Sequence, residues 1–175
     1  KPFLEYQLAE IRKYFNDSKI YLLTHHLSDK IEAYYSDNNK IKIIKEDVPL
    51  GTGGAIKNAI KVLGLNNKDD LLILNGDTYM KPDLHQFINN SSYDINILSM
   101  RQEQCERSST VLIEDNKIKE FSKQGKRKKD SYISIGCYYI KDSNFIIHNK
   151  NKNFMIEEEF IEYSKTGEIG AYFYN

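Results

Sequence analysis

The stretch "EDVPLGTGGAIKNAIKVL", from Glu46 to Leu63, places three glycines directly before a segment with the apolar spacing of a helix. Its apolar residues recur at intervals of three and four, which predicts a helix with one buried face, and Gly64 is a plausible C-terminal stop. Glycine adopts backbone angles that are closed to other residues, and the N–H groups at the start of a helix favour an acceptor-rich ligand. We therefore predict a glycine loop, Leu50 to Gly54, that leads into a helix and faces a ligand.

Strands and helices alternate on both sides of this loop. Phe3–Phe15 has a helical apolar face, Ile20–Leu23 has the pattern of a short buried strand, and Ser28 can cap the next helix. A further strand ends near Lys45, and Leu71–Leu74 form a continuous apolar run, which is typical of a central parallel strand covered on both faces. The alternation predicts an α/β fold of three layers, Rossmann-like, with a mixed, mostly parallel central sheet and right-handed crossovers.

The pattern changes after about residue 100. Two strands flank the turn "EDNK", a longer strand "YISIGCYYI" follows, and a helix closed by Gly167 precedes a last strand in "IGAYFYN". No internal repeat and no linker composition divides the chain, so residues 1–175 are expected to form a single domain.

Charge and composition exclude several classes of partner. Lys+Arg and Asp+Glu each total 25, so the net charge of zero gives no general attraction to nucleic acid or to an anionic membrane. No apolar run approaches the roughly 20 residues that span a bilayer. Cys105 and Cys137 lack the spacing of a disulfide framework or a zinc site, as is usual in a reducing cytosol. We expect a cytoplasmic protein, and its 13 tyrosines are compatible with a homo-oligomer.

The second candidate site is "LNGDTYM", where Asp77 follows the apolar strand. Open α/β sheets bind ligands at the carboxyl ends of their strands, and Mg²⁺ prefers one or two carboxylates together with phosphate oxygens. Asp77 is therefore a candidate metal ligand, and the alternative is that Asp77 or Thr78 caps the helix near Pro82. For the glycine loop, the alternative is a tight connection that needs glycine only for its geometry. Its spacing matches neither the P-loop nor the dinucleotide-binding pattern.

Together, "LGTGGA" (Leu50–Ala55) and "NGDT" (Asn75–Thr78) resemble the sugar-1-phosphate nucleotidyltransferases, which make nucleotide-diphosphosugars. They are most similar to the guanylyltransferases that act on mannose 1-phosphate or D-glycero-D-manno-heptose 1-phosphate, and the intact "LGTGGAIK" favours the heptose enzymes. The resemblance implies a GT-A-like nucleotide-diphosphosugar transferase fold. It also implies that a sugar 1-phosphate attacks the α-phosphate of a nucleoside triphosphate, with GTP favoured, and that pyrophosphate leaves. The product would be GDP-heptose for surface polysaccharide.

The same resemblance implies roles for individual residues. Asp77 would be catalytic and coordinate Mg²⁺ between the phosphates, Lys123 would be a catalytic lysine, and Glu157 would accept hydroxyls of the sugar. Ser134 and Gly136 would also lie against the sugar. The residues expected at the nucleotide are Leu50, Gly51, Thr52, Gly53, Gly54, Asn75 and Gly76.

The sequence departs from the family pattern at several points. The G-T-R-L signature that grips the triphosphate would precede Lys1, and a second metal-binding aspartate would follow "YFYN", so the domain is expected to be truncated at both ends. The usual Glu-Lys reads Lys123-Gln124, so the lysine would come from Lys123 or Lys126, and Ser134 stands where the family commonly has Asn. Two alternatives stay open. One is a catalytically silent or regulatory homologue, and the other is a nucleotide-sugar-dependent glycosyltransferase, although "NGDT" lacks the first aspartate of a D-x-D motif.

Overall fold

The computed structural model describes residues 1–101, 110–122 and 132–174, so that Cys105, Lys123 and Lys126 lie outside the described residues. The helices are α1 (Phe3–Tyr14), α2 (Ser28–Tyr35), α3 (Gly51–Leu63), α4 (Leu84–Asn90), α5 (Asn144–Ile147) and α6 (Ile156–Tyr163). The strands are β1 (Ile20–Thr24), β2 (Ile41–Lys45), β3 (Leu71–Leu74), β4 (Ile95–Arg101), β5 (Thr110–Glu114), β6 (Lys117–Ser122), β7 (Tyr132–Ile140) and β8 (Ile169–Tyr174).

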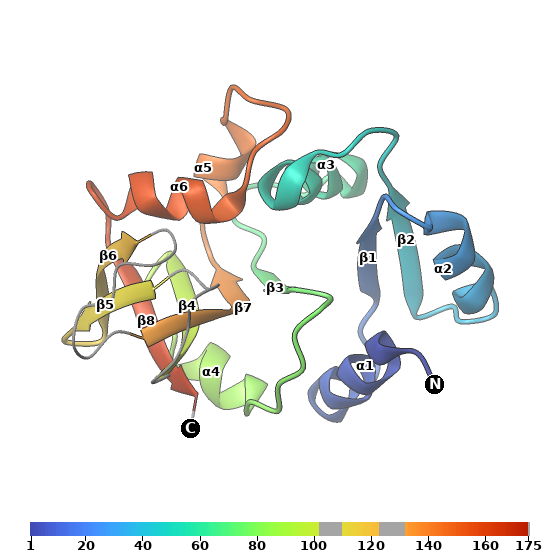
Figure 1. Ribbon diagram of the computed structural model, residues 1–175, viewed down its shortest axis with the longest axis horizontal. Helices are drawn as coiled ribbons and strands as arrows, with labels where there is room; N and C mark the ends of the chain where they lie inside the picture. The colour runs from blue at the N-terminus through green and yellow to red at the C-terminus, as the bar shows by residue number, and fades with distance from the viewer. Residues whose placement is uncertain (102–109, 123–131, 175) are drawn as a thin grey trace.

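The strands form a row with helices on both sides of it. Figure 1 shows α3, α5 and α6 along one side of this row and α1 and α4 along the other. β1 and β2 form a separate parallel sheet, and the remaining strands form a six-stranded sheet in the order β3-β7-β4-β8-β6-β5. β5 also pairs with the start of β7, so five of these six strands close on themselves and β3 lies at the edge. The predicted α/β class is confirmed.

The prediction of a mostly parallel central sheet is wrong for the strands that the structure describes. Their parallel pairs are β1–β2 and β4–β8, whereas β3–β7, β4–β7, β5–β6, β5–β7 and β6–β8 are antiparallel. The reason is that β7 runs back between β3 and β4. In addition, β5 and β6 form a hairpin around Asp115 and Asn116, which both adopt left-handed backbone angles. A run of alternating elements does not indicate which later strand will insert between two earlier ones.

β3 is also not the central strand that its sequence predicts. Within the described chain it pairs only with β7, and each residue of Leu71–Leu74 is half-buried rather than fully buried. The side of β3 that faces away from β7 is directed towards β1, across a gap in the row of strands (Figure 1).

Several local signals were predicted correctly, and one was not. Ile56 and Ile60 on α3 are buried, and Gly64 ends this helix with a left-handed φ of 66°. Ser28, however, does not cap α2. Leu27 precedes the helix with a φ of 55°, and the buried hydroxyl of Ser28 shares a 2.8 Å hydrogen bond with the hydroxyl of Thr24.

Two hydrophobic clusters hold the helices against the six-stranded sheet. The larger includes Ile56 of α3, Tyr138 of β7 and Phe160 of α6. The second includes Phe87 of α4 and Cys137 of β7. Successive residues of β7 thus point into different cores, as the alternation along a strand requires. Among the described residues, no helix has the length and apolar content needed to cross a bilayer.

The buried thiol of Cys137 gives a prediction for alkaline pH. Burial raises the pKa of this thiol to about 12, whereas an unfolded cysteine ionises near about 8.5. Because the unfolded state ionises first, the contribution of Cys137 to the free energy of unfolding is complete below pH ~8.5 and is lost as the pH rises towards ~12. In a Cys105→Ser variant at pH 9, we expect iodoacetamide to modify the folded protein at least about 100-fold more slowly than the urea-unfolded protein. Equal rates would show that Cys137 is not in the core.

Candidate functional site

The glycine stretch is the first turn of α3 rather than a loop. The helix begins at Gly51, whose φ is 71°, and Leu50 occupies the N-cap position. The buried side chain of Glu46 accepts a hydrogen bond of 3.0 Å from the Leu50 N–H. The predicted glycine loop, Leu50 to Gly54, is therefore wrong for Gly51–Gly54, which belong to the helix, and only Leu50 precedes it.

The segment before α6 packs directly on this turn. The Phe154 carbonyl accepts hydrogen bonds from the N–H groups of Gly53 (3.0 Å) and Gly54 (3.2 Å), and the Phe154 N–H donates to the Leu50 carbonyl at 3.0 Å. A Cβ atom at Gly53 would lie 2.2 Å from the Phe154 ring, and one at Gly54 would lie 2.4 Å from the Lys152 carbonyl oxygen. Glycine is therefore required at both positions by close packing. The predicted nucleotide contacts of Gly53 and Gly54 stay a prediction, and their N–H groups already have protein partners.

Thr52 connects α3 to α6 and to β7. Its hydroxyl donates to Glu157 Oε2 at 3.0 Å and accepts from the Ile156 N–H at 3.0 Å. The Tyr138 hydroxyl donates to Glu157 Oε1 at 3.2 Å. Burial, together with the negative charge of Glu157, raises the pKa of the Tyr138 hydroxyl well above its usual range, so Tyr138 is a neutral donor. Both oxygens of Glu157 thus have protein partners, and this carboxylate joins α3 to β7.

The loop that follows β3 is held from two sides. The buried side-chain amide of Gln7, on α1, donates to the carbonyls of Asn75 at 2.6 Å and Thr78 at 3.1 Å. On the other side, the Asn75 N–H donates to the Gly136 carbonyl at 2.8 Å. A Cβ atom at Gly136, which has a φ of 71°, would lie 2.5 Å from Asn75 Nδ2. Gly136 therefore makes room for Asn75 at the point where the register between β4 and β7 shifts.

Asp77 lies between these two fixed points with its side chain exposed. Its Oδ1 accepts a hydrogen bond of 3.2 Å from the Thr78 hydroxyl. The alternative that Asp77 or Thr78 caps the next helix is wrong, because Asp83 is the N-cap of α4 and accepts from the Gln86 N–H at 2.8 Å. The described residues contain no group of three or more His, Cys, Asp or Glu side chains that could hold a metal ion. Asp77 by itself presents one exposed carboxylate, and a cation such as Mg²⁺ can combine one carboxylate with phosphate oxygens.

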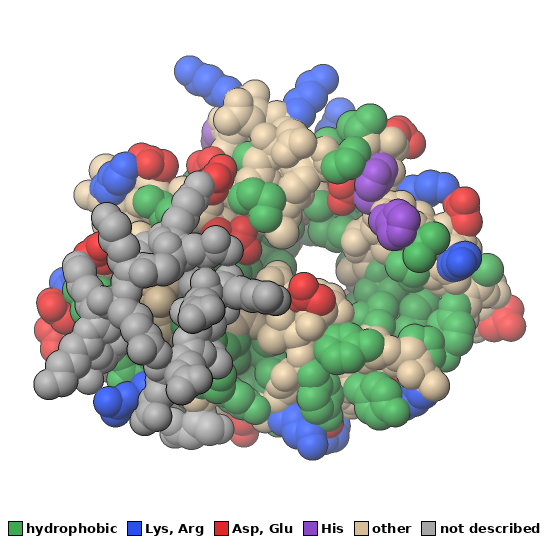
Figure 2. Space-filling model, viewed as in Figure 1, with side chains coloured by type: hydrophobic (Ala, Val, Ile, Leu, Met, Phe, Trp, Pro, Cys, Tyr) green, Lys and Arg blue, Asp and Glu red, His purple; other side chains and the backbone are tan. Residues whose placement is uncertain are grey.

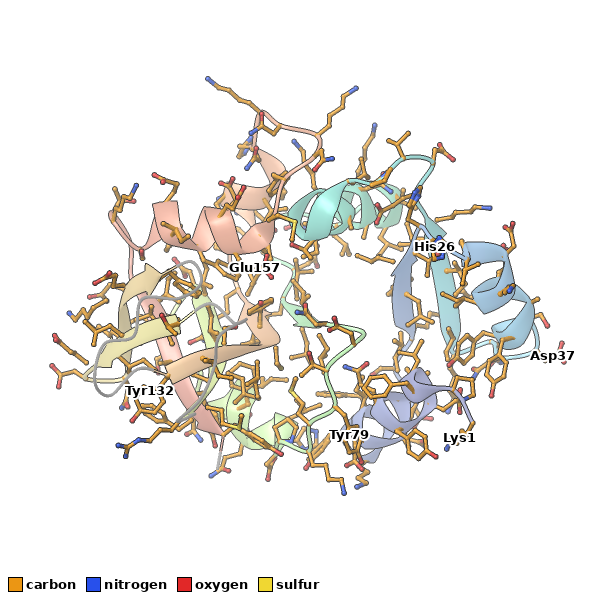
Figure 3. All side chains as sticks on the ribbon, in the orientation of Figure 1. Lys1, His26, Asp37, Tyr79, Tyr132 and Glu157 are labelled. Atoms are coloured by element: carbon orange, nitrogen blue, oxygen red, sulfur yellow. The ribbon has the colours of Figure 1, made fainter. Side chains whose placement is uncertain are left out.

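The structure brings together only some of the predicted site residues. A cavity of about 1410 Å³ is lined by five of them, Leu50, Gly51, Thr52, Asn75 and Gly76. Glu157 lies at the start of α6 close to β3 and β7, as Figure 3 shows. Ser134 precedes Gly136 on β7, and its hydroxyl is 3.5 Å from the Gly136 N–H. The position of Lys123 lies outside the described residues.

Sequence reasoning missed three residues that shape this site. Gln7 and Glu46 are buried polar side chains that bind backbone groups, and Tyr138 is buried beside Glu157. Gln7 shares a helix with apolar residues, and Glu46 precedes the glycines by a few positions, so neither carries a motif. The hydrogen-bond partners of Gln7 and Tyr138 lie far away in the sequence, and Glu46 binds the N–H of Leu50 four residues later. These partners, which only the structure shows, indicate the importance of the three residues.

Comparison with known proteins identifies the family. The family described as Nucleotidyl transferase matches residues 1–173. The chain belongs to this nucleotidyl transferase family. It is 30% identical over 168 residues to D-glycero-alpha-D-manno-heptose 1-phosphate guanylyltransferase from Aneurinibacillus thermoaerophilus, covering 93% of this chain and 71% of that protein. It is 29% identical over 163 residues to the enzyme of the same name from Campylobacter jejuni, covering 91% and 68%.

A solved structure supports the same family assignment. HddC from Yersinia pseudotuberculosis, crystallised in complex with GMP-PN, is 28% identical and superimposes with a TM-score of 0.80. The match covers 99% of this chain and 77% of HddC. The family predicted from "LGTGGA" and "NGDT" is therefore confirmed.

We predict that Gln7→Met lowers the free energy of unfolding by about 1–3 kcal/mol, because the two carbonyls that Gln7 binds lose their shared donor. Methionine has a similar length and no donor, so the loss reports the hydrogen bonds. Gln86→Met changes an exposed side chain and is the matched control, with an expected change within about 0.5 kcal/mol. Urea unfolding of both variants gives the comparison, and equal stabilities would show that Gln7 does not hold the loop.

Thr52→Val should also lower stability by about 1–3 kcal/mol, since the Ile156 N–H loses its acceptor and the Glu157 carboxylate loses a donor. Valine keeps the shape of threonine, so packing on α3 is preserved. Thr166→Val, at an exposed turn, is the control. Thermal unfolding compares the two variants. If they lose the same amount, the contact between Thr52 and Glu157 is not stabilising.

Proposed function

We propose that the full-length protein transfers a nucleotidyl group from a nucleoside triphosphate to a sugar 1-phosphate and releases pyrophosphate. Membership of the nucleotidyl transferase family supports the reaction class. Two relatives near 30% identity are named as heptose 1-phosphate guanylyltransferases, and HddC was crystallised with GMP-PN. These relatives favour GTP and a heptose 1-phosphate as substrates, with GDP-heptose for surface polysaccharide as the product.

The geometry suggests how the two substrates are positioned. Leu50, Gly51 and Thr52 line the cavity from α3, and Asn75 and Gly76 line it from the loop after β3. We assign the nucleotide to these residues. Since the Thr52 hydroxyl and the Tyr138 hydroxyl both bind Glu157, movement of α3 towards a nucleotide would also move the carboxylate that is assigned to the sugar. This hydrogen-bonded contact between α3, α6 and β7 is the observation that carries the assignment of both substrates to one site.

The exposed carboxylate of Asp77 fits the role of a Mg²⁺ ligand. Mg²⁺ usually keeps several waters and binds one or two carboxylates together with substrate phosphates, which does not require a preformed cage of protein ligands. Asp77 meets this condition, because its side chain is exposed and the backbone on each side is fixed by Gln7 and Gly136. When bound, the ion would neutralise charge on the phosphates.

The described residues support catalysis by positioning. Gln7 fixes the backbone around Asp77, and Thr52 and Tyr138 fix Glu157, so that the sugar phosphate can attack in line without a covalent enzyme intermediate. We assign Ser134 and Gly136 to the sugar because Gly136 lies on β7 beside Asn75 and the Ser134 hydroxyl lies 3.5 Å from the Gly136 N–H. The catalytic role of Lys123 remains a prediction from the sequence. Nothing in the family assignment favours the glycosyltransferase alternative.

The proposed function is tested by pyrophosphate release from the full-length protein. GTP, CTP, UTP and dTTP are each combined with heptose, mannose and glucose 1-phosphates, with and without Mg²⁺. We expect the highest rate with GTP and heptose 1-phosphate in the presence of Mg²⁺. Release with another pair would keep the reaction class and change the substrates. Absence of release with every pair would favour the silent homologue.

Asp77→Asn should lower kcat by at least about 100-fold and leave the melting temperature unchanged, because the amide keeps the shape but loses the charge that would hold the cation. Asp37→Asn is the control, because Asp37 is an exposed carboxylate beyond α2, far from Asp77 in sequence (Figure 3). Unchanged turnover in the Asp77 variant would refute its assignment as the metal ligand.

A further inference from the structure

Ser99 of β4 carries a fully buried hydroxyl that has no hydrogen-bond partner in the described part of the chain. Its side chain has no exposed surface, and none of the described donors or acceptors pairs with its Oγ. A buried polar group that is left unpaired costs free energy of folding, and native proteins contain only a few of them. The Ser99 hydroxyl therefore lowers the stability of the free protein, which suggests a role in binding.

The register of the strands places Ser99 at the end of the sheet that carries the candidate site. Ser99 is aligned with Ser134 of β7. Side chains that lie directly opposite on antiparallel strands project from the same face, with Cβ atoms about 4.5–5.5 Å apart. At this end of β7, the Gly136 carbonyl binds the Asn75 N–H. The two serines thus lie where the loop that carries Asp77 begins.

Ser99 points to the face of the sheet that α6 covers. Two residues before Ser99, Ile97 is aligned with Tyr138, and both belong to the hydrophobic cluster that includes residues of α6. Alternate residues of a strand point to the same face, so Ser99 shares the face of Ile97. β7 runs from Tyr138 back to Ser134 while β4 advances from Ile97 to Ser99, so β7 is bulged between the two pairs. Bulges are common beside active sites, where they redirect side chains.

Ser134 connects this position to the pair formed by Tyr138 and Glu157. The Tyr138 hydroxyl donates to Glu157 Oε1 at 3.2 Å. Burial and the charge of Glu157 raise the pKa of the Tyr138 hydroxyl, and hydrogen bonding from the Ser134 side chain acts in the opposite direction. A donor to the phenolic oxygen has this effect because it favours the ionised form. Since a serine hydroxyl has one proton, Ser134 donates to Tyr138 and can meet other groups only as an acceptor.

The chain of donors from Ser134 through Tyr138 ends at a carboxylate that a ligand can reach. Glu157 is half-buried, and Figure 2 shows acidic side chains bordering the opening in the middle of the molecule, in the region where Figure 3 labels Glu157. Ser134 is half-buried as well, so solvent can donate to its oxygen, which the Gly136 N–H approaches only to 3.5 Å. A sugar bound against Ser134 would exclude this solvent and leave the oxygen short of a donor.

We propose that Ser99 is a positioning residue for the sugar 1-phosphate, and that its hydroxyl turns to Ser134 and replaces the solvent donor when the sugar covers that serine. The inference rests on the proposed function, because it deepens the assignment of Ser134 to the sugar. Ser99 can turn without a backbone movement, since its side chain has three staggered positions about one bond. The donors of Ser99, Ser134 and Tyr138 then all point towards Glu157. The free energy that the unpaired hydroxyl costs the free protein is regained when the sugar binds.

Removal of the Ser99 hydroxyl should leave stability intact and weaken use of the sugar. In the full-length protein, Ser99→Ala removes an unpaired group, so Tm should rise or stay within about 2 °C of the wild type. The KM for the sugar 1-phosphate should rise about 10-fold, while kcat and the KM for the nucleoside triphosphate stay within about twofold. Heptose 1-phosphate is the sugar substrate, or the mannose or glucose ester if the wild type turns it over faster.

Ser143→Ala is the matched control. Ser143 is also fully buried, its hydroxyl has no partner among the described residues, and it lies beyond the opposite end of β7 from Ser134. Its substitution should leave Tm within about 2 °C or raise it, and should keep the KM for the sugar 1-phosphate within about twofold.

A double-mutant cycle tests whether Ser99 acts through Ser134. In a Ser134→Ala background, Ser99→Ala should raise this KM by less than about twofold, because the oxygen that needs the donor is already absent. The same 10-fold rise in both backgrounds would overturn the proposal, as would an unchanged KM in the single variant. A fall in Tm beyond about 2 °C in Ser99→Ala would show a structural partner and would also overturn it. Absence of turnover by the wild type with every sugar 1-phosphate would instead refute the proposed function, and this inference with it.

Discussion

The contact between the first turn of α3 and the segment that leads into α6 is the constraint on which the rest of the site depends. The Phe154 carbonyl binds two consecutive N–H groups of α3, and a Cβ atom at Gly53 or Gly54 would collide with that segment. These contacts hold the backbone at the start of α3 directly against the backbone that leads into α6. Thr52 can then reach Glu157, which in turn reaches Tyr138 on β7. The close packing of these two segments thus determines where the side chains of Thr52, Glu157 and Tyr138 meet.

The second fixed point of the site is the loop after β3. Gln7 and Gly136 hold this loop from opposite sides, and Asp77 lies between the residues that they bind. Exposed side chains usually change rotamer within picoseconds to nanoseconds. Here the backbone that carries Asp77 is fixed by buried hydrogen bonds, which are costly to break. The described residues position this carboxylate through the backbone that carries it.

Helices hold the two-stranded sheet beside the six-stranded sheet. α1 and α3 lie on the two faces of the gap, and Gln7 forms hydrogen bonds from α1 to the loop after β3. These helices keep β1 and β3 in one row although no described hydrogen bond joins the strands (Figure 1). The cavity of about 1410 Å³ is lined by residues of both β1 and β3 and thus lies where the two sheets meet.

The sequence by itself determined the local structure and the family. Apolar spacing predicted the buried face of α3, Gly64 predicted its end, and "LGTGGA" with "NGDT" indicated the nucleotidyl transferases, because these signals lie within short stretches of chain. Only the tertiary structure decided that Gly53 and Gly54 serve close packing, that Gln7 holds the Asp77 loop, and that β7 inserts between β3 and β4. Each of these depends on contacts between residues far apart in the chain, and neither periodicity nor a motif encodes which distant backbone group a side chain will meet.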